Sequence, residues 1–193
     1  MRNGVCIGGI NLADNKSIRL HTSTGANQPL DAPFQIGEIW SLDFEPAWNA
    51  RPKPHTEDIS VISQRLIKAI GEAGIEKYVK SNFKVHRGDI SGLYEGNLQF
   101  TNSGKAYIQK PYVPNYSVTF WIPDENLIFF TPSPTKRIYK YKNYSFPFVG
   151  FQDMRGVIPA GKLLRMSLAY WWSPEDSDIA ERCYIQLSGW YNI

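Results

Sequence analysis

The sequence predicts a mainly β protein, built as two antiparallel β-barrels in tandem with one or two short helices between them. Three observations lead to this fold class. Apolar and β-branched residues alternate in short segments that turn residues separate, which is typical of antiparallel strands. One block in the middle shows apolar residues at helical spacing instead. The chain has 193 residues, which is long for one small barrel and enough for two.

Composition and charge are those of a folded globular protein. Hydrophobic residues make up 42% of the chain and charged residues 20%, so we expect a sizeable core. Aromatic residues, at 14%, suit sheet packing or flat stacking surfaces. The formal net charge of +3 permits an anionic partner without requiring one. The N-terminus lacks a signal-peptide pattern and no run approaches the roughly 18 apolar residues of a membrane span, so we expect a cytoplasmic protein.

The first barrel is predicted from the strands that begin the chain. Residues 4–10 form a short apolar strand, and residues 17–20 return after a turn. Gly8 and Gly9 within the first strand indicate a bulge or a close approach of another part of the chain. The alternating segment 35–44 is the last long strand of this barrel.

A helical block is predicted to follow the first barrel. Its apolar residues recur at helical spacing, a polar residue precedes them and glycines follow them. These residues are Ile62, Leu66, Ile67 and Ile70, with Ser63 or Thr56 as the cap and Gly71 or Gly74 as the end. A second helical piece is predicted over residues 75–80.

The second barrel is predicted from the strands of the remaining chain. They lie at 93–100, 105–110, 117–122, 125–131, 162–172 and 182–193. The TNSG segment at 101–104 has the Asn and Gly of a hairpin loop, and the acidic segment 173–181 joins the last two strands. We therefore divide the chain into a first barrel with the helical block at 1–95 and a second barrel at 96–193.

Five segments together resemble the dual OB-fold domain proteins of bacteria. They are the Val-Cys-Ile-Gly-Gly strand, Ser-Ile-Arg-Leu at 17–20, IGEIWSLDF at 36–44, PHTEDISVI at 54–62, and the closing pair LRMSLA and RCYIQLSGWY. The resemblance spans nearly the whole chain and implies two OB-like barrels. It also implies binding of nucleic acid or nucleotides, in some members within bacterial conflict systems. Where family members often have Trp-Ile-Arg-Pro, this chain has Ser17 to Leu20, which removes an aromatic residue.

One basic and tyrosine-rich segment, Lys136 to Tyr144, is a candidate binding surface. OB-folds bind oligonucleotides on one sheet face, and single strands are held by cations together with aromatic platforms. On a strand, however, alternate side chains point to opposite faces. Either the tyrosines pack in the core and the cations are solvated, or the segment forms a binding strip. Its candidate ligand contacts are Lys136, Arg137, Tyr139, Lys140 and Tyr141.

Two arginines, Arg19 and Arg165, lie inside apolar strands, where an unpaired charge is costly. Glu57 and Asp58 are the expected partners, because a guanidinium can bind a carboxylate with two hydrogen bonds. The pairs are then structural. The alternative is that an arginine contacts a phosphate or a base edge.

The His55–Glu57 segment admits a catalytic interpretation, with His55 as a general base and Glu57 as an acid or orienting group. The same residues are also a common loop composition, and Thr56 with its acidic neighbours resembles a helix start. We predict a structural or ligand-contacting role and assign no catalytic residue.

The tryptophan pair Trp171–Trp172 places one indole on each face of its strand. One is expected in the core, and the other, Trp172, could stack on a ligand or partner. The two cysteines, Cys6 and Cys183, are expected to be reduced and buried. The histidines are scattered and no phosphate-binding motif is present, so no metal and no cofactor are predicted.

Three functions remain open from the sequence. The first is a non-enzymatic binding protein that recognises nucleic acid or a nucleotide-like ligand, in the setting of bacterial defence. The second is a protein-interaction module for a partner encoded nearby. The third is a small hydrolase or nuclease that uses His55 and Glu57.

Overall fold

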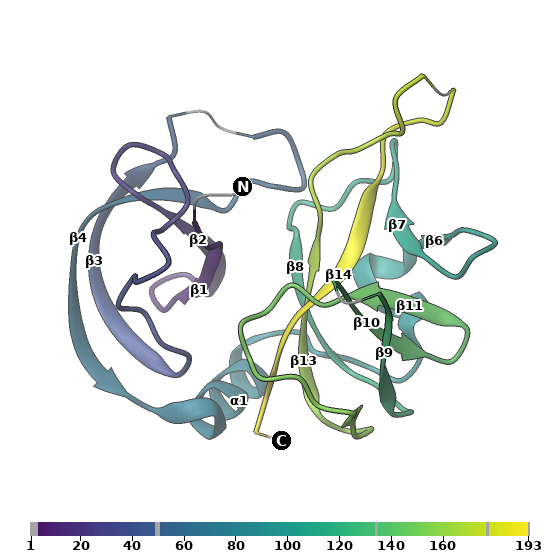
Figure 1. Cartoon of the computed structure of the whole chain (residues 1–193). Coiled ribbons are helices and arrows are strands. Elements are labelled where there is room, and N and C mark those ends of the chain that lie inside the picture. The colour runs from purple at the N-terminus through teal and green to yellow at the C-terminus, as the bar shows by residue number, and fades with distance from the viewer. Residues whose placement is uncertain (1–3, 49–50, 134, 177, 193) are drawn as a thin grey trace.

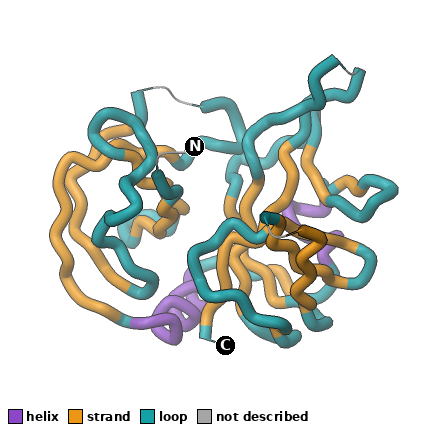
Figure 2. The backbone as a smooth tube through the Cα atoms, in the orientation of Figure 1, coloured by secondary structure: helices purple, strands orange, loops and turns teal. Residues whose placement is uncertain are grey.

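The computed structural model describes residues 4–48, 51–133, 135–176 and 178–192, and over these ranges it is mainly β (Figure 1). It contains two units, each with its own curved sheet system, which confirms the predicted fold class. Figure 2 shows strands on both sides of the molecule, with one helix beneath the space between them. No helix among the described ranges is long and apolar enough to cross a membrane.

The first unit is a four-stranded sheet with the order β1-β2-β4-β3. Its strands are β1 (Ile7–Asn11), β2 (Lys16–His21), β3 (Glu38–Pro46) and β4 (Asp58–Ala69). β1 and β2 form an antiparallel hairpin, β2 and β4 run parallel, and β3 pairs with β4 in a long antiparallel ribbon. A small core of Leu20, Ile59 and Val61 lies inside the curve of the sheet. The predicted strands of the first barrel are present.

The predicted helix over residues 62–70 is wrong, because this segment belongs to strand β4. The register with β3 shifts twice, and each shift leaves one extra residue on β4, at Ile62 and at Ile67. A β-bulge interrupts the alternation of side chains along a strand. Two bulges five residues apart therefore produced an apolar spacing that looks helical. The helix begins one residue after this pattern ends.

Helix α1 (Gly71–Asn82) contains the second predicted helical piece. Gly71 was expected to end a helix, and instead it starts one, with φ of +65°. The helix buries Val79 against the second unit, in a cluster with Phe120, Leu163 and Tyr191. Ile10 of β1 packs against the same cluster, so the helix and this cluster join the two units.

The second unit has two sheets. The six-stranded sheet has the order β5-β8-β13-β14-β7-β6, and the four-stranded sheet has the order β11-β10-β9-β12. The first contains β5 (His86–Arg87), β6 (Gln99–Phe100), β7 (Ala106–Ile108), β8 (Val118–Ile122), β13 (Leu163–Leu168) and β14 (Cys183–Tyr191). The second contains β9 (Leu127–Ser133), β10 (Lys136–Tyr141), β11 (Tyr144–Pro147) and β12 (Val157–Ile158).

Two parallel bridges, Lys105 to Ser145 and Phe148 to Leu187, connect these sheets and curl them around one large core. The predicted hairpins are present: the TNSG turn joins β6 to β7, and β13 pairs with β14. Cys183 is buried in this core, whereas Cys6 is exposed, so the expectation of two buried thiols is wrong for Cys6.

The segment Ile90–Gly96, η1, consists of short 3-10 turns on the two sides of a kink, so the strand predicted over 93–100 is present only at its end, as β6. Its residues Tyr94 and Glu95 adopt left-handed backbone conformations, which a strand cannot contain. The division of the chain at residue 95 remains a prediction. β5, which precedes that point, pairs with β8 of the second unit.

Candidate functional site

A buried group of charged residues lies where the two units meet. The Nη2 atom of Arg19 is 2.5 Å from Oε1 of Glu57, and its Nη1 atom is 3.2 Å from Oδ1 of Asp58. Nη1 also donates to the hydroxyl of Tyr170, and Ser117 donates its hydroxyl to Glu57. Arg19, Glu57 and Asp58 come from the first unit, whereas Ser117 and Tyr170 come from the second. We call these five residues the seam cluster.

The charged side chains of the seam cluster are buried, so each charge is compensated by neighbouring charges rather than by water. The side chains of Arg19, Glu57 and Asp58 are only 11%, 6% and 4% exposed. Burial alone would raise the pKa of the Asp58 carboxyl, but the His21 ring, whose Nε2 atom lies 3.4 Å from Oδ2, and the charges of Arg19 and Arg51 together lower it. The predicted ion pairing of Arg19 with Glu57 and Asp58 is present, and it is a buried one.

His55 packs beside the seam cluster and is 1% exposed. Its Nε2–H donates to the carbonyl oxygen of Ala169 at 3.1 Å, and its ring meets the ring of Tyr170 edge-on at 4.8 Å. Burial, together with the nearby charge of Arg19, lowers the pKa of His55 to about 4. The imidazole is therefore neutral near pH 7, and its burial leaves it almost no surface for contact with an external molecule.

Next to the seam cluster lies a cleft of about 410 Å³ between the two units. We call it the inter-unit cleft. The first unit contributes the start of β2 and the segment before β4. The rest of the lining comes from the residues just after α1, from β5 and η1, and from β8 with the segment before it. The lining side chains on which the argument below depends are Lys16, Glu57, Lys84, Tyr94, Tyr116 and Phe120.

Aromatic rings form one part of the cleft lining. The rings of Tyr94 and Tyr116 stack with centroids 5.9 Å apart and an interplanar angle of 22°. Tyr94 is buried, while Tyr116 is half-buried and donates its hydroxyl to Glu95. Burial and the charge of Glu95 raise the pKa of Tyr116 to about 12, so its hydroxyl stays protonated at neutral pH. The cleft thus presents an uncharged aromatic face.

The backbone that carries Tyr94 is strained. Tyr94 and Glu95 have φ of +50° and +64°, and Gly96 follows with +78°. A residue other than glycine in this region costs about 1–3 kcal/mol, and such residues cluster at functional sites. The Tyr94 hydroxyl, which donates to the Ser117 carbonyl at 3.0 Å, ties the strained segment to the seam.

The lining of the cleft also includes charged groups. Lys16 and Lys84 are exposed at its edge, and Lys16 pairs with Asp14 at 3.3 Å. On the other side, Oε2 of Glu57 is buried, with no hydrogen-bond partner among the described residues. An unsatisfied buried acceptor costs about 1–3 kcal/mol.

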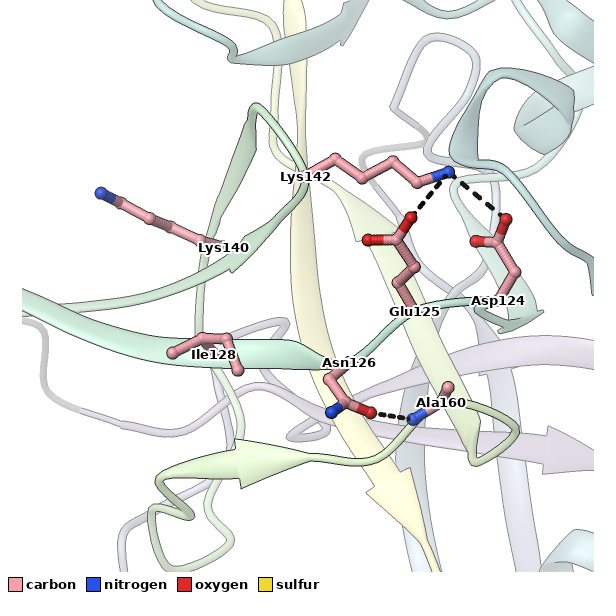
Figure 3. A pocket seen from close by; sticks show the side chains of 7 residues that line it. All are labelled: Asp124, Glu125, Asn126, Ile128, Lys140, Lys142 and Ala160. Carbon is pink, nitrogen blue, oxygen red and sulfur yellow. Dashed lines mark hydrogen bonds and ion pairs between the residues drawn. The ribbon is translucent and has the colours of Figure 1, made fainter.

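A second hollow, of about 650 Å³, lies beside β9 and β10 and is a weaker candidate (Figure 3). Its central cation, Lys142, is shared by Asp89, Asp124 and Glu125 at 3.2, 3.3 and 3.7 Å. Asn126 accepts a hydrogen bond from the backbone of Ala160 at 2.8 Å. Because these polar groups form ion pairs and hydrogen bonds with one another, we interpret this hollow as a structural feature rather than a ligand site.

Comparison with known protein families gives one match. A family model described as a dual OB-containing domain matches residues 1–190. The chain belongs to this family. No curated protein and no solved structure matches. Membership agrees with the two curled β units, between which the inter-unit cleft lies.

In this dual OB-containing domain, the basic segment of β10 divides between two faces. Tyr139 and Tyr141 are fully buried, so as candidate ligand contacts they are wrong: their rings pack in the core of the second unit. Lys136, Arg137 and Lys140 are exposed. The Nζ atom of Lys140 lies 3.8 Å from the centroid of the Phe130 ring.

The other candidates lie apart from this segment. Arg165 donates to the hydroxyl of Ser188 at 3.0 Å, and its guanidinium lies against Gly8 rather than at Glu57 or Asp58. Trp172 is 54% exposed, while Trp171 packs against the main core, which is the predicted split of the two indoles.

The structure therefore brings together Arg19, His55 and Glu57 at the seam, and leaves the β10 cations and Trp172 elsewhere. Sequence reasoning missed Lys16, Lys84, Tyr94 and Tyr116. The one available signal was the turn-like Glu95-Gly96-Asn97 run inside a segment that was assigned to a strand. Tyr116 sits in an irregular segment before β8, and nothing in the local pattern singles it out.

Proposed function

We propose that the protein is a non-enzymatic binding protein that recognises nucleic acid or a nucleotide-like ligand in the inter-unit cleft. The observation that carries this proposal is the presence in one cleft of a half-buried aromatic ring, Tyr116, and two exposed lysines, Lys16 and Lys84. Aromatic rings that stack on bases and cations that meet phosphates are the elements with which OB-folds bind nucleic acids.

Energetics favour the cleft over the β10 surface. A base stacked on an aromatic side chain contributes about 1–3 kcal/mol to binding. The cleft offers a tyrosine ring for such stacking, whereas the tyrosines of β10 are buried. The β10 cations Lys136, Arg137 and Lys140 lie beside one exposed ring, that of Phe130, and Lys140 already occupies a position over that ring.

Binding is tested with a fluorescent single-stranded 12-mer and with labelled nucleotides, by anisotropy at low salt. We expect binding by the unchanged chain and about 10-fold weaker binding by Tyr116→Ala. Tyr112→Ala is the matched control, because Tyr112 is 63% exposed and does not line the cleft. Circular dichroism confirms that each variant folds. If no nucleic acid or nucleotide binds at low salt, the proposal is wrong.

A pair of lysine variants locates the site. Lys84→Ala removes a cation of the cleft, and Lys136→Ala removes one of β10. We expect the first to weaken binding and the second to leave it unchanged. The opposite result would move the site to the β10 surface.

A second candidate function is a protein-interaction module, and the β3–β4 ribbon favours it. Ile62, Leu66 and Ile67 are 58%, 46% and 47% exposed on this ribbon. Exposed apolar side chains that lie close together often mark interaction sites. Purification from the native host, followed by a search for a stoichiometric partner in a preparation without nucleic-acid absorbance, tests this function.

We include a role in bacterial defence in the proposal, on the basis of the family resemblance. Phage challenge of host cells that carry the unchanged gene or the Tyr116→Ala variant tests it. Equal plaque counts in both strains and in a deletion strain would remove this part of the proposal.

A further inference from the structure

We infer that the inter-unit cleft takes a single nucleotide of low charge, of the size of a nucleoside monophosphate, and does not hold a running strand. This inference rests on the proposed function and narrows its ligand. Three features of the cleft carry it: its size, its charge balance and its number of stacking surfaces.

The size of the cleft matches a small molecule. Its volume of about 410 Å³ lies in the range of about 300–1,000 Å³ that small-molecule sites occupy. Its walls come from both units and from five separate segments, around residues 15–17, 56–57, 83–86, 92–95 and 115–120. Such a site encloses one ligand on several sides, whereas a strand needs a groove that continues past each nucleotide.

The charges that line the cleft are balanced. Lys16 and Lys84 are opposed by Glu57 and Glu95, and Lys16 is also paired with Asp14. Glu57 in turn is neutralised by Arg19. Each nucleotide of a strand adds one negative charge, and an OB-fold typically covers about four or more nucleotides. Two lysines can neutralise one phosphate group. The other phosphates of a longer strand would have no cation to pair with among the described residues of this cleft.

The cleft offers few surfaces on which a base can stack. Among its described aromatic side chains, Tyr94 and Phe120 are buried at 1% and 2% exposure. Tyr116 and Phe83 are half-buried, and Phe83 packs edge-on against Phe120 with centroids 5.1 Å apart. One base on Tyr116 uses the surface available, and Glu57, which carries a buried acceptor without a hydrogen-bond partner among the described residues, lines the same cleft.

The test compares four nucleoside monophosphates with a single-stranded 12-mer, by calorimetric titration over a range of salt concentrations. We expect at least one monophosphate to bind, with a salt slope shallower than about 2, since two lysines meet its phosphate. Tyr116→Ala and Lys84→Ala should each weaken that binding about 10-fold or more, while Tyr112→Ala should not.

The outcomes separate this inference from the proposed function. If the 12-mer binds with a salt slope steeper than about 3 and no monophosphate binds, the single-nucleotide inference is overturned and nucleic-acid binding stands. If a monophosphate binds equally to the unchanged chain, Tyr116→Ala and Lys84→Ala, the inference is overturned because its site lies elsewhere. If neither ligand binds, both the inference and the proposed function fall.

Discussion

The guanidinium of Arg19 and the carboxylate of Glu57 form a buried ion pair of 2.5 Å at the junction of the two units. The hydrogen bonds of these two side chains also reach the second unit. Arg19 also donates to Tyr170, and Glu57 also accepts from Ser117, so one ion pair holds two residues of the second unit. The stability of the whole chain should therefore respond to changes at this pair.

Replacing Arg19 with Met should lower the free energy of unfolding by about 3–5 kcal/mol. The reason is that Glu57 and Asp58 would stay buried without a compensating cation. Urea denaturation measures the change. Arg65→Met is the matched control, since Arg65 is exposed on β4 and its loss should change stability by less than about 0.5 kcal/mol. Equal effects of the two substitutions would contradict the buried pair.

Stability should fall as the pH decreases from about 6.5 to about 4, because of His55. The pKa of His55 is about 4 in the folded chain, against 6.5 for an ordinary histidine. Below pH 6.5, His55 becomes protonated in the unfolded chain while it stays neutral in the folded chain. Acid therefore favours unfolding. The loss should be on the order of 2 kcal/mol at pH 5.

The measurement is the urea midpoint at pH 7.5 and at pH 5.0, for the unchanged chain and for His55→Gln. The variant should show a smaller difference between the two pH values. The lowered pKa of Asp58 acts mainly below its ordinary value of 3.8, outside this comparison. An identical pH response in the variant would show that His55 is not the group responsible.

Gly8→Ala should destabilise the chain by about 1–2 kcal/mol, through crowding of Arg165. A Cβ atom at Gly8 would lie 2.3 Å from Nη2 of Arg165, so the guanidinium would have to leave Ser188. Gly9→Ala is the matched control, because a Cβ there would only make an ordinary contact with Ile18 at 3.5 Å. Thermal unfolding of both variants measures the difference.

The Gly8 effect should shrink when Arg165 is replaced with Ala in the same chain. A double-mutant cycle between positions 8 and 165 measures this coupling. Additive effects at the two positions would mean that the glycine is needed for another reason.

Gly104→Ala should lower the free energy of unfolding by about 2–3 kcal/mol. Gly104 has φ of +76°, and a Cβ atom there would lie 2.1 Å from the carbonyl oxygen of Asn143. That contact stands beside the Lys105–Ser145 bridge, which connects the two sheets of the second unit. Gly156→Ala provides the comparison, because its added Cβ would meet no atom within 4 Å in the part of the chain that the structure describes. Similar urea midpoints for the two variants would contradict the predicted crowding.

The sequence by itself determined the fold class, the family and the local elements with a clear period. The β13–β14 hairpin, the TNSG turn and the strand at 17–20 follow from alternation and turn residues, which are local properties. The same local reasoning failed at β4, because two bulges at Ile62 and Ile67 changed the spacing of its apolar residues. A bulge depends on the partner strand, and the partner is not visible in the segment itself.

The candidate site was decided by the tertiary structure. The pairing of Arg19 with Glu57 was predictable, since a buried arginine needs a carboxylate. Its contact with Tyr170, 151 residues away, was not. The cleft lining of Tyr94, Tyr116 and Lys84 depends on how the two units pack and on a strained turn in η1. The period of the apolar residues in a strand indicates which of its faces is buried. How two separate units pack depends on contacts between residues far apart in the sequence, which no local pattern shows.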